Sequence, residues 1–303
     1  MRLLVTGAWQ DAGAHLDMLT AMGHEVAFLQ QEKEPLPVDP AWVEGVICNG
    51  LFLHHPIEAF TSLRYIQLTS AGFDRVPMDA VRARRITIRN ARGVYSVPMA
   101  EHALWGVLSL YHQGAFFLKN QRKARWEKHR GLRELAGKTV CILGCGSVGT
   151  ECAGRFRAFG CRVVGVNRTV RENAAFDAIL PLTALDEALA QTDVVVITLP
   201  LTEQTRGLMN DERLAVMKPG AVLVNIARGA IVDADALLRA LDENLSGAVL
   251  DVFEPEPLAP ESPLWHRPDV IVTPHNSFVG DGNAARLRAV ILKNLEDYLA
   301  DRK

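Results

Sequence analysis

Three short segments in the second half of the sequence carry side chains suited to proton transfer and anion binding. They read NIARGAIVD, LDVFEPEPL and VTPHNS, and they contribute Arg228, Glu256 and His275. An imidazole can give and take a proton near neutral pH, and a guanidinium can hold a carboxylate through paired hydrogen bonds. Each segment follows or ends a predicted strand, so the three side chains are expected at the carboxyl edge of one sheet, where sites in open α/β sheets lie.

Each of these residues also has a plain structural interpretation. An arginine before a glycine is usually a surface residue, Glu256 between two prolines could be only a stiff loop charge, and His275 after a proline could cap a strand. Their joint occurrence at successive strand ends favours a catalytic site, because motif context is what supports such readings. Asp233, by contrast, is expected to cap the helix ADALLRALDEN.

A glycine-rich segment, GCGSVG, lies between the predicted strand KTVCILG and the predicted helix SVGTECAGRFRAFG. Gly144, Gly146 and Gly149 have the GxGxxG spacing, which permits a tight turn and a close backbone approach to a pyrophosphate at a helix N-terminus. A glycine turn kept only for packing is the alternative. We interpret Cys145 as a small filler, since the sequence places no histidine nearby to activate its thiol.

The strand after the glycine loop, CRVVGVN, ends at Asn167 and is followed by Arg168 and Thr169. An NAD site usually carries Asp or Glu here, which binds the ribose hydroxyls and would repel a 2′-phosphate. A guanidinium can instead pair bidentately with a phosphate, and a hydroxyl can add a donor. The segment therefore predicts a preference for NADP over NAD. The alternative is that Arg168 is a solvated surface cation and that NAD binds without the usual carboxylate.

Short apolar runs alternate with helical patterns along the chain. The early runs are RLLVTG, HEVAFLQ, EGVICNG, RYIQLTS and RITIRN, and the later ones are KTVCILG, CRVVGVN, DVVVITLP, AVLVNIA, GAVLDVF and DVIVTPH. This alternation predicts α/β domains with parallel sheets, and the mostly uncharged later strands suit a sheet covered on both faces. The final helix is expected to be amphipathic, with apolar residues at Leu287, Val290, Ile291, Leu295 and Leu299.

A long helix that begins near Val97 and Pro98 is expected to mark a domain junction. We expect residues 1–96 plus 281–303 to form a smaller flavodoxin-like substrate domain, and residues 97–280 to form a Rossmann-type doubly wound parallel sheet. The active site is expected in the cleft between them, where domain closure would exclude water. The apolar segment from Ala103 to Leu118 is too short for a membrane span, so we interpret it as a buried or interface helix.

Composition excludes several classes of function. The 303 residues carry a formal net charge of −2 with both signs interspersed, so neither nucleic acid nor a membrane is an expected partner. The 5 cysteines form no CxxC pair, which suggests reduced thiols, and the start of the chain shows too short an apolar run for a signal peptide. We expect a cytoplasmic protein. His54 and His55 are adjacent and point apart, so no metal site is predicted.

In combination, these motifs resemble the D-isomer-specific 2-hydroxyacid dehydrogenases, a family that includes phosphoglycerate dehydrogenase and glyoxylate/hydroxypyruvate reductases. The resemblance covers nearly the whole chain, through LTSAGFD, PMAEHAL, TLPLTEQTRGLMN, MKPGAVLVNIARGAIVD, LDVFEPEPL and TPH. It implies hydride transfer between NADP(H), or NAD(H), and a small 2-keto or 2-hydroxy acid. By this resemblance His275 is the acid/base, Glu256 pairs with the far ring nitrogen and favours the imidazolium, and Arg228 holds the substrate carboxylate and polarises the carbonyl.

The resemblance also implies binding residues in both domains. Backbone amides of Ala71 and Gly72 in SAGFD receive the substrate carboxylate, while Leu51 and Phe52 shape the pocket for the substrate side chain. A plain turn after a strand is the alternative for SAGFD. The implied cofactor contacts are Gly144, Gly146, Ser147, Val148, Gly149, Asn167, Arg168, Thr169, Leu199, Pro200, Thr205, Ile226, Ala227 and Asp251, the last near the nicotinamide amide.

The sequence departs from the common family pattern in two places. After His275 comes NSF, so Phe278 is expected to narrow the site, which leaves substrate size open. The segment Asn167 to Thr169 resembles the NADP-using reductases of glyoxylate and hydroxypyruvate more than the NAD-using members. Formate oxidation is disfavoured, because formate dehydrogenases of this fold have glutamine where Glu256 stands.

The resemblance further implies a homodimer, formed through the segment from Val97 to about Arg133. The run FFL and Trp126 in that segment look exposed, which agrees with an interface. A rival from another functional class is a catalytically weak, NAD(P)-sensing binding protein, since related co-repressors retain the same fold and triad. Turnover over a panel of acids distinguishes the two.

Overall fold

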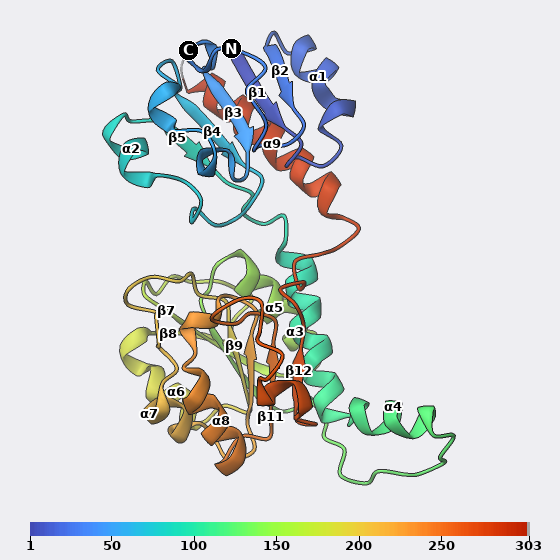
Figure 1. Cartoon of the computed structure of the whole chain (residues 1–303). Helices are drawn as coiled ribbons and strands as arrows, with labels where there is room; N and C mark the ends of the chain where they lie inside the picture. The colour runs from blue at the N-terminus through green and yellow to red at the C-terminus, as the bar shows by residue number, and fades with distance from the viewer. Residues whose placement is uncertain (302–303) are drawn as a thin grey trace. The chain divides into compact units, whose positions relative to one another are not determined.

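The computed structural model describes residues 1–301 and divides into two compact units (Figure 1). The N-terminal unit comprises Met1–Tyr95 together with the chain from Gly280 onward, and the central unit comprises Ser96–Val279. Each unit carries a parallel sheet with helices, which confirms the α/β fold expected from the alternation of apolar runs. No helix in residues 1–301 is long and apolar enough to cross a membrane.

The N-terminal unit has a five-stranded parallel sheet of order β2-β1-β3-β4-β5. Its strands are β1 (Arg2–Thr6), β2 (Glu25–Leu29), β3 (Gly45–Cys48), β4 (Tyr65–Leu68) and β5 (Thr87–Arg89), and all of them fall in the predicted apolar runs. Its helices are α1 (Leu16–Ala21), α2 (Met78–Ala83) and α9 (Asn283–Ala300), with 3₁₀ turns at Ala12–His15, Pro40–Trp42, Leu51–Leu53 and Ile57–Ala59.

Helix α9 shows why the end of the chain returns to the first sheet. Leu287, Ile291 and Leu295 are at most 5% exposed and pack against Leu3 and Val5 of β1. Their spacing gives one apolar stripe on the helix, and burying that stripe provides the main driving force for docking. The amphipathic pattern expected for the final helix is therefore confirmed.

The central unit has a seven-stranded parallel sheet of order β12-β11-β10-β9-β6-β7-β8. Its strands are β6 (Thr139–Leu143), β7 (Arg162–Asn167), β8 (Ala178–Pro181), β9 (Val194–Ile197), β10 (Val222–Asn225), β11 (Gly247–Leu250) and β12 (Val270–Val272). Its helices are α3 (Ser96–Tyr111), α4 (Gly114–Arg122), α5 (Ser147–Ala158), α6 (Leu185–Ala190), α7 (Asp211–Val216) and α8 (Ala234–Glu243), with 3₁₀ turns at Leu182–Ala184, Gly229–Ile231 and Pro263–His266.

Two features of the central unit differ from the sequence-based expectation. Strand β8 was not predicted, because it is an edge strand of only 4 residues that ends at a proline. The segment from Ala103 to Leu118 was expected to be one helix, but it breaks between α3 and α4. Gln113 at the break has φ of +54°, a left-handed conformation that cannot continue an α-helix.

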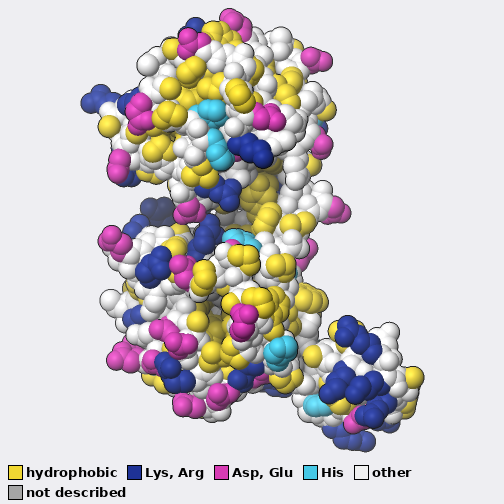
Figure 2. Space-filling model, viewed as in Figure 1, with side chains coloured by type: hydrophobic (Ala, Val, Ile, Leu, Met, Phe, Trp, Pro, Cys, Tyr) yellow, Lys and Arg dark blue, Asp and Glu magenta, His cyan; other side chains and the backbone are white. Residues whose placement is uncertain are grey.

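Helices cover both faces of the seven-stranded sheet. One core holds side chains of α6, α7 and α8, and the other holds side chains of α3 and α5. Asp233 caps α8 by accepting a hydrogen bond from the amide of Ala236 at 2.9 Å, which confirms its predicted role. Figure 2 shows Lys and Arg side chains gathered over α4 and the chain that follows it, while both signs of charge mix elsewhere on the visible face.

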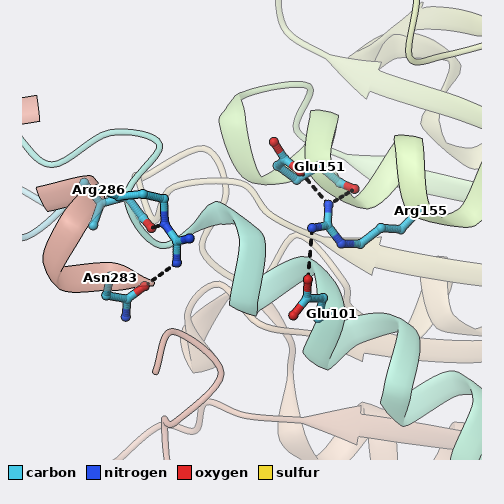
Figure 3. A network of polar contacts seen from close by, with 6 residues as sticks. Glu101, Glu151, Arg155, Asn283 and Arg286 are labelled. Atoms are coloured by element: carbon cyan, nitrogen blue, oxygen red, sulfur yellow. Dashed lines mark hydrogen bonds and ion pairs between the residues drawn. The ribbon is translucent and has the colours of Figure 1, made fainter. Parts of the chain in front are cut away.

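Polar contacts of arginines fix helices within each unit (Figure 3). In the central unit, Arg155 of α5 pairs with Glu101 of α3 at 3.1 Å and with Glu151 of its own helix at 2.5 Å. In the N-terminal unit, Arg286 of α9 donates to the carbonyl oxygen of Val94 at 2.7 Å and to Asn283 at 2.9 Å. The first of these contacts joins α3 to α5.

Candidate active site

The three segments singled out in the sequence lie at the carboxyl ends of three adjacent strands. Arg228 follows β10, Glu256 follows β11 and His275 follows β12, and these strands are neighbours in parallel register. Parallel strands bring their carboxyl ends to one edge of a sheet, so the loops share that edge. A Cβ atom added at Gly229 would lie 2.0 Å from the backbone carbon of Phe253, which shows how closely the first two loops pack.

His275 and Glu256 form a hydrogen-bonded pair. The ring Nδ1 lies 2.9 Å from Oε2 of Glu256, and the other carboxylate oxygen accepts the backbone amide of Phe253 at 3.0 Å. The two side chains are 41% and 38% exposed, so a ligand can reach them. With Nδ1 held by the carboxylate, Nε2 is the ring atom available to exchange a proton with a bound molecule.

The backbone at His275 is strained, and hydrogen bonds to Asp251 hold it in place. Its φ of +51° lies in the left-handed region, which costs a residue other than glycine about 1–3 kcal/mol. Asp251, 0% exposed, opposes this strain, because its carboxylate accepts the amides of Asn276 at 2.8 Å and Ser277 at 3.0 Å. Its backbone oxygen accepts the amide of His275 at 2.7 Å. These contacts fix the direction in which the imidazole leaves the loop.

Arg228 lies on a loop whose backbone is held by hydrogen bonds to Asn225. Asn225, at the end of β10, donates to the carbonyl oxygen of Arg228 at 3.0 Å and accepts the amide of Ala227 at 3.1 Å. The guanidinium donates to the carbonyl oxygen of Ala227 at 2.7 Å and is partly buried. Ile226 and Ala227, expected as cofactor contacts, are 1% and 7% exposed, so little of either residue is open to a ligand.

The glycine loop fits a dinucleotide. Gly144 has φ of +104°, and a Cβ atom at Gly149 would lie 2.0 Å from the carbonyl oxygen of Gly144, so both positions require glycine. Gly146 is exposed and has nothing within 4 Å of its would-be Cβ atom, which leaves open space at the N-terminus of α5. Ser147 and Val148 begin that helix, whose first amides carry no side-chain cap.

Cys145, within the same loop, is a packing residue. Burial raises the pKa of its thiol to about 11, so the thiol is protonated at neutral pH. A Cβ atom at Gly165 would lie 2.4 Å from its sulfur, which shows that the side chain fills the space beside β7. Both observations support its interpretation as a filler rather than a nucleophile.

The polar segment predicted to contact the adenosine ribose of the cofactor lies at the end of β7. Asn167 donates from Nδ2 to the carbonyl oxygen of Thr169 at 2.9 Å, which closes a short turn. Arg168 and Thr169 are exposed, and no ion pair within residues 1–301 engages the guanidinium of Arg168. No carboxylate occupies the turn.

The loop after β9 lies at the same carboxyl edge of the sheet. Thr198 donates to the carbonyl oxygen of Gly144 at 2.8 Å, so this loop is tied to the glycine loop. Thr205 donates to the carbonyl oxygen of Pro200 at 2.7 Å and accepts the amide of Thr202 at 2.7 Å. The hydroxyl of Thr205 therefore shapes the loop that carries Leu199 and Pro200, both of which have exposed surface.

The expected substrate residues lie at the carboxyl ends of β3 and β4 in the N-terminal unit. The side chain of Leu51, expected to contact a substrate, instead packs in the core at 0% exposure, whereas Phe52 is partly exposed and meets Phe60 edge-on at 5.8 Å. Asn90 donates to the carbonyl oxygen of Ala71 at 2.6 Å. Within residues 1–301, the amides of Ala71 and Gly72 donate to no backbone or side-chain oxygen, so both are available to donate to an anion.

Sequence reasoning missed two residues behind the proposed acid/base. Thr273 donates to Asp251 at 2.6 Å, and the Nε2 atom of His102 lies 3.2 Å from the same hydroxyl oxygen. His102 is in PMAEHAL and Thr273 is in TPH, two of the segments that resemble the family. Nothing local in the sequence connects these two residues. His55, one of the two histidines without an expected metal role, contacts the carbonyl oxygen of Glu32 at 2.9 Å.

Known proteins of similar sequence cover most of this chain. A family described as D-isomer specific 2-hydroxyacid dehydrogenase, NAD binding domain, matches residues 104–277. A putative 2-hydroxyacid dehydrogenase of Haemophilus influenzae is 31% identical over 82% of this chain and 82% of its own. A glyoxylate reductase of Thermofilum pendens is 32% identical over 79% of this chain and 73% of its own.

Solved structures show the same architecture with either dinucleotide. A D-isomer specific 2-hydroxyacid dehydrogenase of Xanthobacter autotrophicus, in complex with NADPH and MES, has a TM-score of 0.80 and 31% identity over 99% of this chain and 95% of its own. A D-lactate dehydrogenase of Aquifex aeolicus, complexed with NAD and lactic acid, has a TM-score of 0.79 and 26% identity over 99% of this chain and 96% of its own.

Proposed function

The chain belongs to the D-isomer specific 2-hydroxyacid dehydrogenase family and is an NAD(P)-dependent oxidoreductase, and on this premise we propose that it is an NADP-preferring reductase of small 2-keto acids. The observation that carries the proposal is the pair of His275 and Glu256, at 2.9 Å, on the sheet edge that also holds Arg228 and the glycine loop. That edge combines a proton donor, an anion-binding cation and a dinucleotide cradle.

The proposed mechanism assigns one task to each side chain. A nicotinamide dinucleotide held by the glycine loop and the turn at Asn167 would supply the hydride for reduction and would accept it in oxidation. His275 gives its Nε2 proton to the carbonyl oxygen, while Glu256 holds Nδ1 and stabilises the charged ring that precedes this transfer. Arg228 binds the substrate carboxylate and polarises the carbonyl, so negative charge that develops on oxygen meets a fixed cation.

We propose that the two units divide the binding tasks. Residues 1–96 plus 281–303 bind the substrate, with the amides of Ala71 and Gly72 receiving its carboxylate and Phe52 facing its side chain. Residues 97–280 bind the cofactor through the glycine loop, the turn at Asn167 and the loops that carry Leu199, Pro200 and Thr205. Phe278, whose ring meets His275 edge-on at 6.1 Å, limits the size of the substrate.

The test of the proposed function is the loss of NADPH absorbance with glyoxylate, hydroxypyruvate, pyruvate and phenylpyruvate. Turnover of the small acids, with phenylpyruvate reduced more slowly, is the expected result, because Phe278 stands beside the ring that donates the proton. Tight NADPH binding with negligible turnover of every acid would instead favour the nucleotide-sensing alternative. A protein partner would then have to be sought.

The preference for NADP is tested at Arg168. We expect Arg168→Ala to raise the KM for NADPH roughly 10-fold and to leave the KM for NADH nearly unchanged, because a charge-assisted contact with the 2′-phosphate is lost. Arg171→Ala is the matched control, since Arg171 is an exposed cation on the same segment. A wild-type preference for NADH that Arg168→Ala does not change would contradict the proposal.

We further propose that the chain forms a homodimer through residues 97–133. The exposed large apolar side chains there are Trp105, Phe117, Leu118, Trp126 and Leu132, and Trp126 is 98% exposed. Apolar groups so gathered on one segment indicate an interface. We expect a dimer in sizing experiments, and Trp105→Asp should shift it toward monomer because a charge would be buried there.

The control for the dimer is Trp265→Asp. Trp265 is 46% exposed, close to the 49% of Trp105, but it lies outside residues 97–133. It should leave the sedimentation coefficient unchanged. A monomeric wild-type protein at micromolar concentration, measured by analytical ultracentrifugation, would refute this part of the proposal.

A further inference from the structure

We propose that His102 of α3 is a positioning residue for the acid/base, which it supports by holding the loop of His275 in place through Thr273 and Asp251. The inference rests on the proposed function, because it extends the role given there to His275. All four residues belong to the central unit, and none of the roles assigned so far uses His102.

The carboxylate of Asp251 determines the direction of the first hydrogen bond. It lies 2.6 Å from the hydroxyl oxygen of Thr273 and also accepts the amides of Asn276 and Ser277. An ionised carboxylate can only accept, so the hydroxyl proton of Thr273 points at Asp251. The hydroxyl oxygen of Thr273 is thereby left as an acceptor.

His102 is the group that donates a hydrogen bond to this oxygen. Its Nε2 atom lies 3.2 Å from the hydroxyl oxygen of Thr273, so Nε2 carries the proton and donates it. Burial lowers the pKa of His102, and the charge of Asp251 opposes that effect, so the neutral ring protonated at Nε2 satisfies the contact at neutral pH. A continuous series of donors then runs from His102 through Thr273 to Asp251.

Helix α3 holds the ring at the required place. The preceding residue, Glu101, pairs with Arg155 of α5 at 3.1 Å, which fixes the rotation of α3 at this level (Figure 3). The ring of Trp105 packs on His102 with 5.2 Å between centroids. Thr273 is 171 residues away in the sequence, so the contact joins the start of the central unit to its last strand.

The consequence for His275 follows from the burial of Asp251. A carboxylate that is 0% exposed depends on each of its donors, and a donor that itself receives a hydrogen bond donates more strongly. Losing His102 would weaken the Thr273 contact and leave its hydroxyl free to rotate. The two backbone amides held by Asp251 would then loosen, and with them the left-handed conformation at His275.

The experiment compares two substitutions of similar length. His102→Gln keeps an amide donor near the position of Nε2, whereas His102→Met keeps the bulk and removes the donor. We expect His102→Met to lower kcat by roughly 10- to 100-fold and to change the KM for NADPH by less than about twofold, because a small displacement of a reacting group has effects of that order. His102→Gln should restore most of the activity.

A second measurement does not depend on activity. Hydrogen–deuterium exchange of residues 275–278 reports the amides of Asn276 and Ser277 that Asp251 holds. We expect faster exchange at these residues in His102→Met. Thr273→Val removes the other partner of the same contact and should also exchange faster. His102→Gln should exchange like the wild type. Ser109→Ala, which alters α3 two turns beyond His102 and outside the contact with Thr273, is the control and should exchange like the wild type.

The outcomes separate this inference from the proposed function. Wild-type exchange at residues 275–278 in His102→Met would overturn the inference, whatever the activity and even if Thr273→Val exchanged faster, because Thr273 also donates to Asp251 directly. Faster exchange with an unchanged kcat would also overturn it, because the loop would then have no effect on catalysis. High turnover by His275→Ala would count against the proposed function alone, since the exchange measurement requires no turnover.

Discussion

His275→Ala is expected to lower kcat for reduction of a small 2-keto acid by about 10²- to 10⁴-fold, the range that a positioned acid or base contributes. The ring is 41% exposed and its Nδ1 atom is held by Glu256, so Nε2 is the group that faces a bound molecule. Removing the ring takes away the proposed proton donor and leaves the glycine loop intact. The KM for NADPH should therefore stay near its wild-type value. Steady-state kinetics with NADPH and glyoxylate measure both constants.

His266→Ala provides the comparison for His275→Ala. His266 is exposed, lies in the same unit, and ends a 3₁₀ turn away from the carboxyl edge of the sheet. It should keep wild-type kinetics. Turnover by His275→Ala within a few-fold of the wild type would show that another group transfers the proton, and the role given to His275 would have to be abandoned.

Arg228→Ala is the second change for which we expect a large effect. The kcat/KM for the 2-keto acid should fall by about 10²- to 10³-fold, because one fixed donor to a developing oxyanion contributes an effect of that size. The loop should survive the substitution, since its hydrogen bonds with Asn225 use backbone atoms of Ala227 and Arg228. The affinity for NADPH, measured through the fluorescence of the nucleotide, should be unaffected.

Two further variants sharpen the test at this position. Arg228→Lys keeps the charge but loses the planar fork that fits a carboxylate, so it should recover only part of the lost kcat/KM. Arg206→Ala removes an exposed guanidinium that lies 3.9 Å from Glu254 in the same unit, and it should behave as the wild type. Equal losses in Arg206→Ala and Arg228→Ala would point to general electrostatics rather than to binding of the substrate by one residue.

The alternation of apolar runs was sufficient to predict most of the fold. A strand that is buried on both faces must be apolar along its length, so β6, β9, β10 and β11 stand out in the sequence. Strand β8 lies at the edge of its sheet and ends at a proline, so the same rule does not apply to it. The break between α3 and α4 also escaped prediction, because the conformation of Gln113 is set by what surrounds it rather than by its type.

The sequence by itself determined the glycine loop, the side chains at the strand ends and the edge of the sheet to which they come. These follow from local rules, because parallel strands deliver their carboxyl ends to one edge whatever their order. It also left Leu51 as a candidate for contact with a substrate, and only the structure shows that this side chain is buried in the core.

Only the tertiary structure decided which groups stand behind the proposed acid/base, His275. The link from His102 through Thr273 to Asp251 joins α3 to the ends of β11 and β12, and it depends on distances of about 3 Å between side chains far apart in the sequence. Periodicity reports whether a residue faces the core or solvent, and it carries no information about partners across the fold. The strained backbone at His275 was hidden for the same reason, since the contacts that hold it come from another strand.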